Sequence, residues 1–239
     1  MSTKGCIYYT DFHADPKILT VCCEQLKKSF DGDIVSVSLN KPLNLGKNII
    51  LENAERSYQT MVKQIIIGLE ALSTDYVFFT ESDVLYHKSH FDFTPPKDNI
   101  FYYDENTWRW WIGSDKAIRH DRMLSLSSLC ANREFTLNHY KRRQEKIKEK
   151  GWDKITGGEP EWARAMGYEP GTKKKKRGGF SDDDFDIWNA ECPSIDIRHE
   201  GTFSNPKTKI EHFKHKPKWF KEIDIDKIDS WNLRKLFNL

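Results

Sequence analysis

The apolar residues in the first part of the chain follow two alternating periods. Runs of β-branched and aromatic residues predict strands at Cys6–Thr10, Ile34–Leu39 and Asp75–Thr80, and apolar positions three or four residues apart predict helices at Pro16–Phe30 and Ser57–Leu72. Asp15 before Pro16 is typical of a helix start. This strand–helix–strand order predicts parallel strands, and the last strand, apolar on both faces, is expected to be central.

The second part of the chain is patterned less regularly. We expect strands at Asn99–Tyr103 and Trp108–Ile112, helices at Arg119–Leu129 and Glu134–Lys150, and a weakly amphipathic helix at Lys227–Leu239. The whole pattern predicts an α/β fold in which a mixed, mainly parallel central sheet is flanked by helices. A chain of 239 residues with 38% hydrophobic residues suits a single domain, 1–239.

Composition excludes several classes of protein. No run approaches the roughly 20 apolar residues that span a bilayer, and the first residues lack the apolar core of a signal peptide, so we expect a cytoplasmic protein. The five cysteines have no C-x-x-C spacing, which favours buried free thiols over a disulfide framework or a zinc site. A net charge of +2 does not by itself demand a polyanionic partner.

Two acids follow the predicted central strand directly. Glu81 and Asp83 alternate in an extended segment, so both carboxylates face the same side and can reach one hard cation. Ligands of open α/β sheets bind beyond the carboxyl ends of strands, which is where this pair lies. The alternative is that the two acids simply begin a loop.

The order of elements leading into Tyr-Val-Phe-Phe-Thr-Glu-Ser-Asp resembles the N-terminal half of GT-A (Rossmann-like) glycosyltransferases with their D-x-D signature. The resemblance covers about residues 5–95 and departs from the signature at Glu81. It implies a nucleotide-diphosphate sugar as donor, such as a UDP sugar, with Mn²⁺ or Mg²⁺. It assigns Asp83 to the metal and Glu81 to the ribose or a metal-bound water, and leaves about 96–239 as the acceptor half and C-terminal elements.

The same resemblance implies further donor contacts. Tyr9, Thr10 and Asp11 correspond to the first strand–helix turn, which holds the base and ribose; Asp11 is equally suited to capping the turn before the first helix. Tyr58 and Lys63, on the helix that enters the metal strand, resemble positions that approach the donor.

A late imidazole is the third candidate ligand of the metal. Cys192-Pro-Ser-Ile-Asp-Ile-Arg-His199 is a short apolar strand that ends in a charged loop. Many GT-A enzymes supply such a histidine, and His199 is the candidate; the alternative is a histidine satisfied by hydrogen bonds at a strand end. Arg198 is suited to pairing with the diphosphate, or equally with a structural carboxylate such as Asp196.

An inverting transfer needs a general base, whereas a retaining transfer does not require that arrangement. Glu161 is the first candidate and Glu159 the second, although acids are ordinary in the first turn of a helix. Trp108, Trp110 and Trp111 are suited to stacking on a sugar or to forming core. The acidic run 181–184 is a second acidic site, a general base or a solvated turn.

A basic run lies between glycines, at Lys173, Lys174, Lys175, Lys176 and Arg177. It is a solvated loop, a lid over the diphosphate or a clamp on a phosphate backbone, in which case the acceptor is a hydroxylated base in DNA rather than a glycan. Two other functions stay open. A nucleotidyltransferase would use the same sheet and cation but usually has a glycine-rich first loop, and a non-catalytic nucleic-acid-binding protein would rely on the basic run and the tryptophans.

Overall fold

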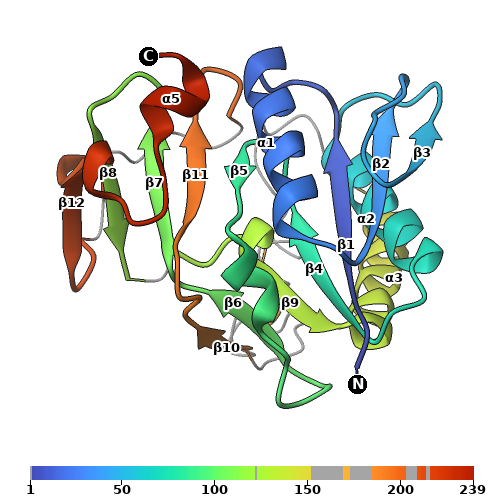
Figure 1. The fold of residues 1–239 in the computed structure, drawn as a ribbon. Helices are drawn as coiled ribbons and strands as arrows, with labels where there is room; N and C mark the ends of the chain where they lie inside the picture. Colours follow the sequence, from blue (N-terminus) through green and yellow to red (C-terminus); the bar gives the residue numbers. More distant parts are fainter. Residues whose placement is uncertain (1, 122, 152–168, 173–184, 203–208, 214–215) are drawn as a thin grey trace.

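A computed structural model describes residues 2–121, 123–151, 169–172, 185–202, 209–213 and 216–239 (Figure 1). Its larger sheet has seven strands in the order β10-β6-β9-β4-β1-β2-β3. The strands are β1 (Lys4–Thr10), β2 (Asp33–Leu39), β3 (Lys47–Leu51), β4 (Tyr76–Thr80), β6 (Phe101–Asp104), β9 (Leu129–Asn132) and β10 (Phe185–Trp188). β9 runs antiparallel to both of its neighbours, and the other neighbouring pairs are parallel. The predicted mixed, mainly parallel α/β sheet is therefore confirmed.

Helices cover both faces of this sheet, with α1 (Pro16–Ser29) on one face and α2 (Tyr58–Ala71) and α3 (Arg133–Lys150) on the other (Figure 1). Side chains alternate along β1, so Ile7 and Tyr9 pack in the core under α2, whereas Cys6 and Tyr8 pack in the core under α1. The caps follow the sequence: Asp15 accepts a hydrogen bond from the amide of Lys17, and Ser57 caps α2.

A second sheet lies beside the first, in the order β12-β8-β7-β11-β5 (Figure 1). Its strands are β5 (Val84–Leu85), β7 (Thr107–Trp111), β8 (Lys116–His120), β11 (Ser194–Arg198) and β12 (Phe220–Asp224). Helix α5 (Leu233–Phe237) and residues of α1 share its core, in which Trp110 is fully buried and Trp108 partly buried. Of the two roles left open for the tryptophans, the structure supports that of core residues for Trp108 and Trp110, whereas Trp111 is half-buried and lies outside this core.

Two sequence predictions are wrong. The expected helix at Arg119–Leu129 is instead the end of β8, the 3-10 turn η2 (Leu126–Ser128) and the start of β9. Serines explain the error: the Ser125 and Ser127 hydroxyls hydrogen-bond to each other, and Ser128 Oγ donates to the carbonyl of Ser125, so these side chains compete with helical hydrogen bonds. In the expected C-terminal helix, only α5 is α-helical, preceded by the 3-10 turn η5 (Ile225–Lys227).

The cysteines match the prediction of free thiols. Cys6, Cys22, Cys23 and Cys130 are buried, Cys192 is partly buried, and all five are unbridged. Within the described ranges, the remaining 3-10 turns are η1 (Lys88–Asp92) and η4 (Ile210–His212).

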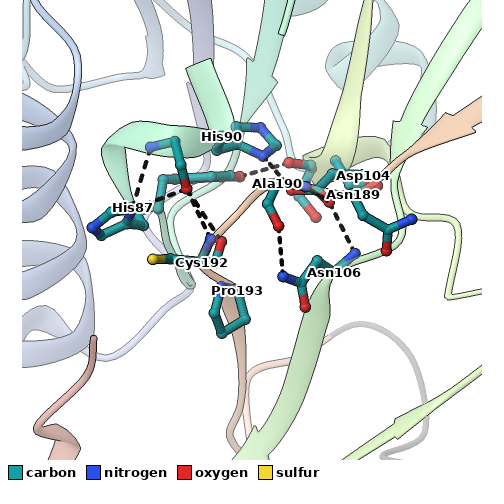
Figure 2. A network of polar contacts seen from close by, with 12 residues as sticks. His87, His90, Asp104, Asn106, Asn189, Ala190, Cys192 and Pro193 are labelled. Atoms are coloured by element: carbon teal, nitrogen blue, oxygen red, sulfur yellow. Dashed lines mark hydrogen bonds and ion pairs between the residues drawn. The ribbon is translucent and has the colours of Figure 1, made fainter. Parts of the chain in front are cut away.

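A buried polar network joins the two sheets at the carboxyl end of β6 (Figure 2). Asp104 accepts hydrogen bonds from the amides of Asn106 and Ala190, at 2.9 and 3.2 Å, and its other oxygen lies 2.8 Å from Nδ1 of His90 in η1. The side-chain nitrogen of Asn106, Nδ2, donates to the backbone carbonyl of Ala190, and Ser89 Oγ accepts from the backbone amide of Cys192. These contacts fix the segment that leads into β11.

Candidate functional site

A cleft opens where the carboxyl ends of β1, β2 and β4 meet, the position expected for a ligand of an α/β sheet. Its volume of about 290 Å³ is close to the lower end of small-molecule sites. The residues that line it are Tyr9, Thr10, Asp11, His13, Ala14, Leu39, Arg56, Ser57, Tyr58, Thr60, Met61, Gln64, Glu81, Ser82, Asp83, His199, Gly201 and Thr202. Both sheets and the first turn of α2 thus contribute to one site.

Neighbours from both sheets hold the backbone and the side chains of the acidic segment. Glu81 donates its amide hydrogen to the Tyr86 hydroxyl at 3.2 Å, and the Asp83 carbonyl accepts from the amide of Ile197 in β11 at 2.8 Å. The Tyr9 hydroxyl donates to Glu81 Oε1 at 2.5 Å. The acids therefore lie at fixed positions in the cleft.

Burial and the neighbouring charge of Asp83 both disfavour the ionised form of Glu81. Burial, followed by the charge of Asp83, raises the pKa of Glu81 from 4.5 to about 8, although the hydrogen bond from Tyr9 opposes this shift. A cation bound beside Glu81 would stabilise its ionised form and so oppose this rise in pKa.

His199 approaches this pair from the end of β11. Its Nε2 lies 3.6 Å from Asp83 Oδ2, and this buried nitrogen has no hydrogen-bond partner among the described residues. Nδ1 accepts the amide hydrogen of Gly201 at 3.1 Å, so a neutral ring carries its proton on Nε2, facing Asp83. Gly201 is required here because a Cβ would lie 2.7 Å from the carbonyl oxygen of His13.

The residues expected to contact the base and the ribose also line the cleft. Tyr9, Thr10 and Asp11 all line it, but the Asp11 carboxylate is already engaged by the Arg56 guanidinium and by the amide of His13. The pairing with Arg56, which lies in a distant loop, was not predicted from the sequence.

The two candidate donor contacts on α2 have different environments. Tyr58 lines the cleft, and its hydroxyl accepts a hydrogen bond from the buried guanidinium of Arg143 in α3 at 2.6 Å. Lys63 is exposed and does not line the cleft. The structure therefore brings Tyr58, but not Lys63, to the site.

Arg198 does not line the cleft. Its guanidinium is 2.6 Å from Asp196 Oδ2, and Arg109 shares the same oxygen at 3.3 Å. Although burial alone would raise the pKa of Asp196, the two arginines lower it below its ordinary value of 3.8. Of the two partners considered for Arg198, the structure provides the structural carboxylate.

Sequence reasoning missed Gln64, a cleft residue that is 3% exposed. Its signal was a polar residue on the apolar face of α2, three residues after Met61 and four before Gly68. The candidate bases Glu159 and Glu161, the acidic run 181–184 and the basic run 173–177 lie outside the described residues.

The described residues contain neither a ready-made metal cluster nor a membrane-spanning helix. No group of three or more His, Cys, Asp and Glu side chains there is close enough, as the side chains stand, to hold a metal ion. None of the helices in the described ranges is long and apolar enough to cross a bilayer.

Comparison with known proteins does not assign a family. No family model matches the chain, and neither does any curated protein. Two structures of the glycosyltransferase GlyE from Streptococcus pneumoniae TIGR4, one of them the apo form, align at TM-scores of 0.40 and 0.41 with 11% and 10% identity. Each alignment covers 63% of this chain and 39% of GlyE, so the chain spans about two fifths of that protein. Rv0371c from Mycobacterium tuberculosis H37Rv aligns at 0.38 with 8% identity, over 59% of this chain and 77% of that one. Similarity at this level identifies neither a family nor an activity.

Proposed function

We propose that the protein is a metal-dependent glycosyltransferase that moves a sugar from a nucleotide-diphosphate donor to an acceptor hydroxyl. The observation that carries this proposal is the meeting of Glu81, Asp83 and His199 at one end of a cleft. The first turn of α2 borders the same cleft, and the positive end of its dipole favours an anionic ligand.

Two features of these residues fit a divalent cation such as Mn²⁺ or Mg²⁺. Burial and the charge of Asp83 raise the pKa of Glu81, an effect that a nearby cation would oppose, and the buried Nε2 of His199 lacks a hydrogen-bond partner in the described part of the chain. We assign both carboxylates as ligands and His199 as a third ligand. Ligation through Nε2 requires the ring to give up the hydrogen bond from Gly201, because the ring proton must then reside on Nδ1.

When bound, the cation would neutralise negative charge on the diphosphate leaving group. The side chains around it orient the donor: Tyr9 holds Glu81, the β11 backbone holds Asp83, and Arg143 holds Tyr58 against the cleft. The acceptor hydroxyl attacks the anomeric carbon, the carbon–oxygen bond to the diphosphate breaks, and the departing nucleotide keeps the electron pair. Glu161, or else Glu159, stays the proposed acceptor of the hydroxyl proton if the transfer inverts.

The decisive experiment measures release of nucleoside diphosphate from a panel of nucleotide sugars, with Mn²⁺ and with EDTA. We expect one donor to be hydrolysed slowly with metal only, and Asp83→Asn to lower the rate at least 100-fold because the variant loses a charged ligand. Asp92→Asn, which removes an exposed carboxylate outside the cleft, is the matched control and should keep the wild-type rate.

Hydrolysis that is unchanged in EDTA, or in the Asp83 variant, would refute the metal-dependent mechanism. Once a donor is known, glycans and hydroxymethylated DNA can be compared as acceptors, which tests the predicted role of the basic run 173–177.

A further inference from the structure

Gln64 presents a hydrogen-bond acceptor whose orientation is fixed by the fold. Its Nε2 donates to the carbonyl oxygens of Thr10 at 3.0 Å and Val37 at 2.9 Å. Because both partners are acceptors, the amide cannot be turned around without placing oxygen against oxygen. The Gln64 carbonyl oxygen, Oε1, therefore faces away from these two strands.

This oxygen makes no hydrogen bond with any described residue, although Gln64 lines the cleft and is 3% exposed. Because Oε1 is not one of the fully buried unpaired atoms of the described residues, it is open to the cleft, where water or a ligand can supply the donor. Leu39 and Met61 line the cleft as well and add apolar surface. Apolar walls and an acceptor with a set direction together suit a flat ring with an N–H group on its edge.

The position along the sheet also fits a base. Gln64 binds the ends of β1 and β2, whereas Glu81 and Asp83 follow β4, on the far side of β1. Adjacent strands are about 4.8 Å apart, so Gln64 lies roughly 5 to 10 Å along the sheet from the acids. A ribose bridges about this separation between a diphosphate and a base.

Asp11, the residue expected to read the base or ribose, is occupied by Arg56 and by the amide of His13. We propose that Gln64 is the specificity-determining residue for the nucleotide: Oε1 accepts a hydrogen bond from an N–H group of the base, between Leu39 and Met61. Because both amide hydrogens are held by strand carbonyls, Gln64 selects an edge that donates. The inference rests on the proposed function only in that a nucleotide binds this cleft.

The test is a cycle in which the ligand and the protein are changed separately. Calorimetry with Mn²⁺ first ranks UDP, GDP, ADP and CDP, and the tightest is compared with the analogue that is methylated at its base donor, such as 3-methyl-UDP or N6,N6-dimethyl-ADP. Methylation should weaken binding to the wild-type protein at least tenfold. In Gln64→Met, where no acceptor remains, methylation should weaken binding less than threefold.

Gln59→Met is the matched control, since it makes the same change at an exposed position of α2. It should keep the tenfold methylation penalty, and Mn²⁺-dependent pyrophosphate binding should be equal in all three proteins if the metal end is intact. If Gln64→Met does not fold, the wild-type comparison still decides, because an absent methylation penalty overturns the inference.

Two further results would overturn it as well. One is an equal methylation penalty in the wild type and Gln64→Met. The other is a loss of affinity on 2′-deoxygenation that is seen in the wild type but not in Gln64→Met, because Oε1 would then bind the ribose and not the base. If no nucleoside diphosphate binds, the proposed function fails together with the inference. If a nucleoside diphosphate binds but Gln64→Met does not reduce the methylation penalty, the inference alone fails.

Discussion

Asp196 is the carboxylate on which two arginines converge, and it is 5% exposed. Removing its charge leaves Arg109 and Arg198 without the carboxylate that they share. We expect Asp196→Asn to lower the free energy of unfolding by about 3 kcal/mol, the usual cost of breaking a buried ion pair, as measured by urea denaturation at pH 7.

This loss has a defined dependence on pH. The folded-state pKa of Asp196 is depressed, so its contribution is complete above the ordinary value of 3.8 and disappears as the pH falls through the lower folded value. The wild type and Asp196→Asn should therefore converge in stability only below about pH 4. A difference that stays constant from pH 7 to pH 3 would contradict the ion-pair explanation.

Gly201 brings two loops of the cleft into contact. A Cβ would lie 2.7 Å from the carbonyl oxygen of His13 and 2.9 Å from Cε1 of His199, so one of the loops must move. Gly201→Ala should cost about 1 to 3 kcal/mol of stability, as overpacking does, and should weaken Mn²⁺ binding by displacing His199. Denaturation and metal titration check the two effects, and wild-type values for both would show that the contact is unimportant.

At this scale, the sequence predicted the residues whose position follows from a strand end. Glu81 and Asp83 follow β4 and His199 follows β11, as expected, and all three line the cleft. Contacts between distant segments could not be predicted from the sequence. Nothing in the sequence indicates that Arg56 engages Asp11, because that contact depends on how two loops fold together.

Helix α2 carries Gln64 and Tyr58 to the cleft, and its first turn depends on one serine. Ser57 Oγ accepts the amide hydrogen of Thr60 at 3.1 Å. Ser57→Ala should lower stability by about 1 kcal/mol, the typical value of an N-cap. Ser73→Ala, at an exposed position just after the helix, is the control and should stay within about 0.5 kcal/mol of the wild type.

Helices and strands in which apolar residues recur regularly were predicted, whereas a segment shaped by side-chain hydrogen bonds was not. The strands β1, β2 and β4 and the helices α1 and α2 follow apolar spacing closely. The segment before β9 has leucines at helical spacing, yet its serines satisfy one another and its backbone in a 3-10 turn. The short edge strand β3 gave no periodic signal long enough to detect.

The connection between the two sheets is a property of the whole molecule, and it depends on Asp104. Its buried carboxylate accepts two backbone hydrogen bonds and contacts the buried side chain of His90 (Figure 2). Asp104→Ala leaves these donors without an acceptor and should lower stability by about 3 kcal/mol or more. Asp104→Asn keeps one oxygen and should cost less, because His90 can accept from the new amide group.

Urea denaturation of both variants checks this order. Nucleotide binding should weaken with stability, since the network fixes the segment before β11 and His199 follows that strand. An alanine variant within about 1 kcal/mol of the wild type would show that the junction is not supported by this carboxylate.

The amide of Ile197 in β11, which supports the carbonyl of Asp83, has a consequence for synthesis of the chain. The strands that complete the larger sheet beside β4, and the strand that pairs with β5, all come from the later part of the sequence. On the ribosome, the acidic segment therefore emerges long before its backbone partner is translated. A nascent chain halted before β11 would contain both acids without the strand that sets their spacing, so ability to hold metal should arise late in translation and abruptly.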